Sequence, residues 1–229
     1  MKLFSIYKTM EESAELCPDG HNIKMLIRHS IRQDIKDGAS IEEIENAKLT
    51  REGKKMAERL GESLYIEIGT VSSSYSHRCI DTCQEIINGY RKNQSDFIKP
   101  ILKTEMLQCP HSKKIPEEKE TWKNLGLKGV FNGFATNINM PGFHDLETSV
   151  NRMVNYIFET GNKNNTLDIF CTHDFQIAML LLFINGKSIE YNKALFDESD
   201  NWPFMLESIF LWGNKNEYNL SWRGKINKM

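Results

Sequence analysis

Lys24-Met25-Leu26-Ile27-Arg28-His29 is a short apolar run that ends on an arginine and a histidine. A second run of the same kind, Leu167-Asp168-Ile169-Phe170-Cys171-Thr172-His173, also ends on a histidine. Short apolar runs bounded by polar residues are typical of buried strands in a parallel sheet. Functional groups in open α/β sheets gather at the carboxyl ends of such strands. The two histidines are therefore expected to meet at one site.

Strand and helix patterns alternate along the chain. The periodicity predicts strands at 24–29, 66–71, 100–107 and 167–172, and helices at 50–64, 77–90, 146–160 and 174–183. Two more strands, at 207–212 and 218–222, are predicted to form a hairpin around residues 213–216. This order indicates an α/β fold with a doubly wound, mostly parallel sheet, flanked by helices on both faces, with an antiparallel edge at the end.

Two segments interrupt the alternation. Residues 108–145 hold several prolines and glycines together with Trp122, Phe131, Phe134 and Phe143. A segment of this length inside a compact domain is usually a functional insertion or a lid. Residues 186–205 are expected to form an irregular excursion. The 229 residues therefore predict a single domain over residues 1–229, with a lid-like insertion at about 108–145.

Charge and composition exclude several classes of partner. The formal net charge is −2 and the basic residues are dispersed, so neither nucleic acid nor an anionic membrane is an expected partner. No apolar stretch approaches the roughly 20 residues of a membrane span. The apolar region at the start of the sequence is too short for a secretory signal. Five cysteines without a dense pattern favour reduced thiols. We expect a cytoplasmic protein, although a signal removed before residue 1 would leave no trace. No pattern predicts the oligomeric state.

His29 has arginines on both sides, at the spacing Arg28-His29-x-x-Arg32. A neutral imidazole is a competent nucleophile. Arginine matches phosphate oxygens in a bidentate geometry and keeps its charge at any working pH. The motif therefore indicates phosphate chemistry, although taken alone it is more often a core histidine between ion-pairing arginines.

Two further positions carry phosphate-compatible groups. Asp174 follows His173 at the start of an expected helix, where it could cap the helix or act as the general acid that protonates a leaving oxygen. Arg78 follows a serine-rich segment at the start of another helix, whose backbone N–H groups favour an anion. Each has a simpler alternative, a helix cap for Asp174 and an exposed helix-start side chain for Arg78.

In combination these motifs resemble the histidine phosphatase superfamily. Arg28-His29-Ser30-Ile31-Arg32 is similar to its Arg-His-Gly-x-Arg signature, and Leu49 to Gly61 is similar to its Leu-Thr-x-x-Gly helix. Ser73 to Thr82 resembles its Ser-Ser…Arg…Thr block, and Thr172-His173-Asp174 resembles its second histidine with the acid of the acid-phosphatase branch. The matches follow one order from residue 24 to about 182, and the chain looks closer to the acid-phosphatase branch than to the phosphoglycerate mutase branch.

The resemblance implies a role for each residue. His29 would accept the phosphoryl group, and Asp174 would protonate the leaving oxygen before water releases phosphate. The phosphoryl oxygens would be bound by Arg28, Arg32, Arg78 and His173. The implied activity is hydrolysis of a small phosphomonoester through a phosphohistidine, with no metal and no organic cofactor.

Some residues depart from the family pattern. Ser30 stands where the family usually has glycine, so it is strained if that position needs a positive φ, or else adds a hydroxyl to the pocket. In the mutase branch a glutamate after the third strand donates the proton, and Glu105 lies near that position. Asp174 is favoured because Arg32 and the His-Asp pair both fit the acid-phosphatase pattern. Two alternative functions stay open: a phosphoglycerate mutase-like phosphotransferase, and a catalytically weak protein of the same fold that binds phosphorylated ligands.

The other histidines carry less information. His21, His111 and His144 lie in expected loops and are predicted to be solvated. Cys109-Pro110-His111 offers two metal ligands without a second pair at suitable spacing, so no zinc site is expected.

Overall fold

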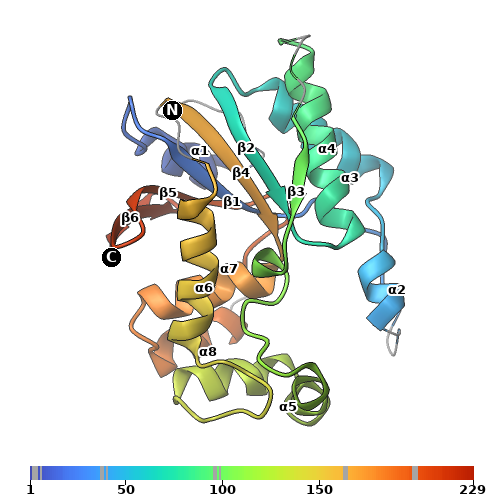
Figure 1. Ribbon diagram of the computed structural model, residues 1–229, viewed down its shortest axis with the longest axis vertical. Coiled ribbons are helices and arrows are strands. Elements are labelled where there is room, and N and C mark those ends of the chain that lie inside the picture. The colour runs from blue at the N-terminus through green and yellow to red at the C-terminus, as the bar shows by residue number, and fades with distance from the viewer. Residues whose placement is uncertain are drawn as a thin grey trace.

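The computed structural model contains one seven-stranded sheet with helices packed on both faces (Figure 1). The structure describes residues 1, 5, 7–36, 39, 41–94, 97, 99–161, 165–197 and 201–229. The strands are β1 (Ile23–Arg28), β2 (Glu67–Ser73), β3 (Ile101–Lys103), β4 (Thr166–Thr172), β5 (Ser208–Asn214), β6 (Glu217–Trp222) and β7 (Lys225–Lys228). The helices are α1 (Lys8–Glu15), α2 (Ile41–Asn46), α3 (Arg51–Glu62), α4 (His77–Arg91), α5 (Ile115–Ala135), α6 (Leu146–Glu159), α7 (Asp174–Ile184) and α8 (Ile189–Asp197), with a 3₁₀ turn at Glu105–Leu107.

The strand order is β3-β2-β4-β1-β5-β6-β7. The pairs β3–β2, β2–β4 and β4–β1 are parallel, whereas β5, β6 and β7 add an antiparallel edge. Helical crossovers connect the parallel strands, as parallel pairing requires. The predicted α/β fold with a parallel core and an antiparallel edge is confirmed.

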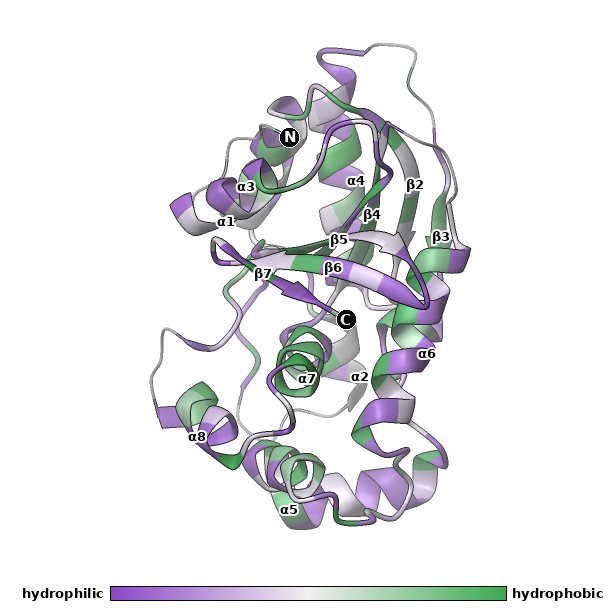
Figure 2. Ribbon diagram, turned by 90° about the vertical axis from the view of Figure 1, so that its left-hand side faces the viewer, coloured by the Kyte–Doolittle hydropathy of each residue, from purple (hydrophilic) through white to green (hydrophobic). Residues whose placement is uncertain are grey.

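Alternating side chains of the central strands enter two separate cores. On β1, Met25 and Ile27 pack with α1, α3 and α4, whereas Leu26 packs on the other face with α6 and α7. This division follows from the two-residue period of a strand. Helix α7 is buried from Phe175 to Leu182. It is mostly hydrophobic, as its green colour in Figure 2 shows. Both faces of the sheet are thus covered, which explains why β1 and β4 are mostly apolar and almost fully buried.

Helices α3 and α4 approach each other closely at two glycines. A methyl group on Gly61 would lie 2.0 Å from the Ile86 carbonyl oxygen, and one on Gly89 would lie 1.9 Å from the Glu58 carbonyl oxygen. Backbone atoms cannot move aside as a flexible side chain can. The two glycines therefore set the spacing of the helix pair that carries Arg78 into the site.

Gly89→Ala is expected to lower the free energy of unfolding by roughly 1–3 kcal/mol through overpacking, measured by urea denaturation. Gly129→Ala in α5 is the matched control, because its methyl group would meet only the Leu125 side chain of the preceding turn. The control should change the free energy of unfolding by less than about 1 kcal/mol, because the higher helix propensity of alanine offsets the close contact with the exposed Leu125 side chain. Equal stability of the two variants would contradict the close contact.

The segment 186–205 contains a helix, so the prediction that it is irregular is wrong, and the segment 108–145 contains a helix that the sequence pattern does not predict. Helix α5 spans most of 108–145 and is kinked at Gly126, where φ is 62°. Its aromatic residues Phe131 and Phe134 are buried in the core beside α7. Helix α8 lies within 186–205, of which 198–200 fall outside the described residues. Pro116 and the glycines of α5 conceal its periodicity, although proline is tolerated in a first helical turn.

Candidate active site

His29 and His173 meet because β1 and β4 are neighbours in register. Arg28 lies opposite Thr172, and the His29 backbone N–H donates to the Thr172 carbonyl oxygen at 3.0 Å. The chain thus leaves both strands at the same edge of the sheet. The two imidazole rings are edge to face, with centroids 5.5 Å apart.

One nitrogen of the His29 ring has no hydrogen-bond partner among the described residues. His29 is buried, and its Nδ1 lies 2.8 Å from the Ser30 carbonyl oxygen. Since a carbonyl oxygen only accepts, Nδ1 carries the proton in the neutral ring and Nε2 carries a lone pair. Burial lowers the pKa of His29 to about 3, and the charges at His173 and Arg78 add to the effect. His29 is therefore a neutral imidazole with an unprotonated Nε2 at physiological pH.

His173 is oriented by the loop between β2 and α4 and by the first turn of α4. Arg78 Nη2 donates to His173 Nδ1 at 3.1 Å, so the proton of the neutral ring is on Nε2. Nε2 lies 3.1 Å from Ser74 Oγ and 3.5 Å from Ser76 Oγ. The side chain of His173 is thus fixed from two directions beside His29.

Arg78 is a buried cation of the site and not an exposed helix-start side chain. It is 9% exposed and lies in the first turn of α4. Its Nη1 donates to the Ile44 carbonyl oxygen of α2, while its buried Nε has no hydrogen-bond partner among the described residues. Burial lowers the pKa of Arg78, but an arginine keeps its charge after such a shift. The guanidinium group therefore places a positive charge next to the histidine pair.

Arg28 and Asp174 form an ion pair at the same edge. Arg28 Nη2 lies 2.7 Å from Asp174 Oδ2, and Arg28 Nη1 donates to the Pro203 carbonyl oxygen. Burial raises the pKa of Asp174, but Arg28 and the Trp202 hydrogen bond outweigh it and leave that pKa below its usual value. The alternative that Asp174 is the helix cap is wrong, because the N-cap of α7 is His173 and Asp174 is already helical. Asp174 is a carboxylate in the free protein.

Arg32, Ser30 and Glu105 are placed differently. Arg32 Nη1 donates to the Gln33 carbonyl oxygen at 2.8 Å. Burial is the main cause that lowers the pKa values of Arg28 and Arg78, and the nearby charge of Arg32 lowers them further. Ser30 is absent from the described residues with positive φ, and its Oγ donates to the Gly53 carbonyl oxygen at 2.7 Å. The serine is therefore unstrained and ties β1 to α3, and its hydroxyl is used there. Glu105 is exposed in the turn after β3.

His111 is buried, so the prediction that it is solvated is wrong. Its Nε2 lies 3.1 Å from Glu118 Oε1 of α5, and its ring stacks on Phe143 with centroids 5.3 Å apart. His111 is buried because its loop packs against helix α5, which the sequence pattern does not predict. Across the described parts of the chain, no three histidine, cysteine, aspartate or glutamate side chains are arranged to hold a metal ion.

Sequence reasoning missed Trp202, which contacts the site from the segment before β5. Its Nε1 donates to Asp174 Oδ2 at 3.2 Å. The segment has neither strand nor helix periodicity, and a tryptophan beside a proline is no signal of function. Only the tertiary structure brings it to Asp174.

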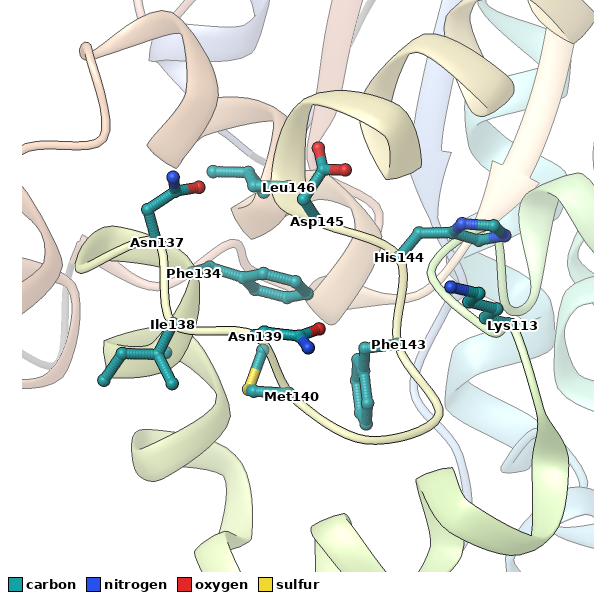
Figure 3. A pocket seen from close by; sticks show the side chains of 11 residues that line it. Lys113, Phe134, Asn137, Ile138, Asn139, Met140, Phe143, His144, Asp145 and Leu146 are labelled. Atoms are coloured by element: carbon teal, nitrogen blue, oxygen red, sulfur yellow. The ribbon is translucent and has the colours of Figure 1, made fainter.

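A cavity of about 240 Å³ lies apart from the histidine pair, beside the loop between α5 and α6 (Figure 3). Lys113 and His144 lie side by side at one end of it, and Phe134 lies on the other side (Figure 3). Burial, Arg152 and Lys113 lower the pKa of His144. None of the residues at the histidine pair lines this cavity.

Comparisons with known proteins bear on the family and the fold of the chain. The family model described as histidine phosphatase superfamily (branch 1) matches residues 25–195. A phosphoglycerate mutase from Bacillus anthracis str. Sterne is similar in structure, with a TM-score of 0.54, 14% identity, and coverage of 89% of this chain and 94% of the mutase.

Two further solved structures are similar to the chain. A mycobacterial glucosyl-3-phosphoglycerate phosphatase has a TM-score of 0.52 and 14% identity over 89% of this chain and 99% of its own. A phosphoserine phosphatase from Entamoeba histolytica, in complex with 3-phosphoglyceric acid, has a TM-score of 0.51 and 14% identity over 83% and 90% of the two chains. No curated protein sequence matches the chain. At these identities the likeness shows the fold. In the part of the chain that the structure describes, no helix is long and apolar enough to cross a membrane.

Proposed function

The chain belongs to the histidine phosphatase superfamily, and we propose that it is a phosphomonoester hydrolase that acts through a phosphohistidine on His29. The observation that carries the proposal is the neutral His29 ring, whose Nδ1–H is held by Ser30 and whose Nε2 is unprotonated. A nucleophile of this kind beside Arg28 and Arg78 is what phosphoryl transfer requires, because arginines offset the charge on the phosphoryl oxygens.

The reaction has two steps. In the first, His29 Nε2 attacks phosphorus, the bond from phosphorus to the leaving oxygen breaks, and Asp174 supplies the proton to that oxygen. In the second, water attacks phosphorus, the phosphorus–nitrogen bond breaks, and Asp174 takes the proton of the water. The phosphoryl oxygens are bound throughout by Arg28, Arg32, Arg78 and His173.

The position of Asp174 suits the general acid better than the position of Glu105 does. It is paired with Arg28 at the histidine pair, whereas Glu105 is exposed beyond β3. An arriving phosphate competes for Arg28 and brings negative charge, and both changes favour the protonated form of Asp174. Binding of the substrate therefore prepares the acid that the free protein lacks.

A second candidate is a catalytically weak protein that binds phosphorylated ligands. The Arg28–Asp174 ion pair favours it, because an ionised carboxylate donates no proton. A mutase-like phosphotransferase would instead pass the phosphoryl group to a second hydroxyl of its substrate.

Hydrolysis of an aryl phosphate in the presence of a chelator tests the proposal. An aryl leaving group needs little protonation, so the assay does not depend on Asp174. Turnover should persist with the chelator and should not be limited by His29 from about pH 8 down to about pH 4, because protonation of His29 begins only near its pKa of about 3. Folded protein without turnover at any pH would favour the binding function, and loss of turnover with the chelator would contradict metal-free chemistry.

A further inference from the structure

The Asp174 carboxylate is held by three donors from three directions. Oδ2 accepts from Arg28 Nη2 at 2.7 Å and from Trp202 Nε1 at 3.2 Å. Oδ1 accepts the Phe175 backbone N–H at 2.9 Å. Each carboxylate oxygen offers about two lone-pair directions, so the described donors use Oδ2 fully and leave one direction of Oδ1. That direction of Oδ1 is available to carry a proton.

The segment that carries Trp202 is bound to β1. The Arg28 backbone N–H donates to the Glu207 carbonyl oxygen at 3.0 Å, and the Leu206 N–H donates to the Arg28 carbonyl oxygen at 3.2 Å. Arg28 Nη1 also donates to the Pro203 carbonyl oxygen. The backbone on both sides of Phe204 is therefore fixed relative to Arg28 and His29.

A second ion pair holds the same segment from the antiparallel edge. Arg223 binds both carboxylate oxygens of the buried Glu207, at 2.7 and 2.9 Å. Arg223 Nη2 also donates to the Trp202 carbonyl oxygen at 3.2 Å, and Glu207 Oε2 accepts the Phe204 N–H at 2.8 Å. Bidentate arginine–carboxylate pairs combine strength with fixed geometry.

The indole ring of Trp202 is fixed by other aromatic rings. It lies edge to face against Phe131, with centroids 5.6 Å apart, and packs against Phe196 of α8 at 5.2 Å. Phe131 in turn packs against Phe175, the residue after Asp174. The direction of the indole N–H is thus set before any substrate arrives.

We propose, on the basis of the proposed phosphatase function, that Trp202 is a positioning residue that fixes the carboxylate of Asp174 for protonation of the leaving group. Arg223 and Glu207 hold the segment from which Trp202 acts. Since Trp202 and Arg28 share Oδ2, they turn Oδ1 toward the substrate and oppose its early protonation.

The charged and titratable groups around Asp174 set the sign of the expected effect. Arg28 from β1, His29 and His173 lower the pKa of Asp174. The charge of Asp174 in turn raises the pKa of Arg78 of α4. Loss of the indole N–H removes one donor to the ionised form, so the protonated form persists to higher pH. The loss of one hydrogen bond to a charged group should displace the pKa of that group by about one unit.

Trp202→Phe tests this role, with Trp122→Phe as the matched control. Trp122 Nε1 donates to a different carboxylate, Glu118, and its ring packs on Phe175, so the control loses the same group from the same aromatic cluster. For an alkyl phosphate, which needs the acid, the pH at which the rate falls should rise by about one unit in Trp202→Phe only. For an aryl phosphate, the two variants should have the same pH profile as the wild type.

The indole N–H resonances test the contact without turnover. The sequence has four tryptophans, and Trp202→Phe and Trp122→Phe assign two signals in a ¹⁵N–¹H spectrum. Asp174→Asn should shift the Trp202 signal alone, and Glu118→Gln the Trp122 signal alone. An unmoved Trp202 signal, or equal alkyl phosphate profiles for the two phenylalanine variants, would overturn the positioning role while wild-type turnover stands. Wild-type protein without turnover would overturn the proposed function and this role together.

Discussion

His29→Ala is expected to lower kcat/KM for aryl phosphate hydrolysis by roughly 10⁴- to 10⁶-fold, the effect of removing a covalent nucleophile from a catalytic unit. The reason is that neither Arg78 nor His173 can replace Nε2 as the attacking atom. Both are held by other contacts, His173 with its Nδ1 on Arg78 and its Nε2 beside Ser74. Initial rates at saturating and subsaturating substrate measure the loss.

His144→Ala is the control for this prediction. His144 is half-buried at the separate cavity and lies away from the histidine pair. It should retain turnover close to that of the wild type. The phosphate affinity of His29→Ala should change far less than its rate, because the arginines remain. A His29→Ala variant that hydrolyses as fast as His144→Ala would contradict a nucleophilic role.

Arg78→Ala is expected to reduce kcat by about 10³-fold or more, the size of effect seen for arginines that stabilise the transition state of phosphoryl transfer. Arg78 joins His173 and the Ile44 carbonyl oxygen through two nitrogens, and its buried Nε has no hydrogen-bond partner in the described parts of the chain. Arg78→Lys should restore little activity, because an ammonium group is a point charge and cannot make the forked contact. Steady-state kinetics with one aryl phosphate measure both variants.

Arg91→Ala at the far end of α4 removes the same group from an exposed position of the same helix. It should behave as the wild type, and the urea midpoints of the variants show whether a loss of rate is a loss of folding. A folded Arg78→Ala protein with the rate of Arg91→Ala would remove Arg78 from the phosphate pocket.

The sequence pattern predicts the parts of the fold in which local and tertiary requirements agree. The runs that become β1 and β4 are mostly apolar and buried because both faces of the sheet are covered. Thr50 caps α3 through a hydrogen bond from the Gly53 N–H, as its residue type predicts. The meeting of His29 and His173 follows from parallel pairing alone.

The remaining features depend on contacts that no local pattern encodes. Helix α5 is concealed by Pro116 and Gly126 because its stability comes from packing of its aromatic face on α7. The Arg28–Asp174–Trp202 contacts join three segments distant in sequence, and they replace the helix cap that the residue type alone suggests. The family match is to branch 1, so a closer kinship with the acid-phosphatase branch stays a prediction, as does the single domain with a lid-like insertion at 108–145.

Trapping of the intermediate tests the central claim most directly. The protein is mixed with an aryl phosphate, quenched in alkali within the first turnovers because phosphohistidine is labile to acid, and digested for mass spectrometry. The account predicts a phosphoryl group on Nε2 of His29. This group should be absent from His29→Ala, and it should be lost from the wild type once the substrate has been consumed. Steady turnover with no phosphorylated histidine, or with the phosphoryl group on another residue, would contradict it.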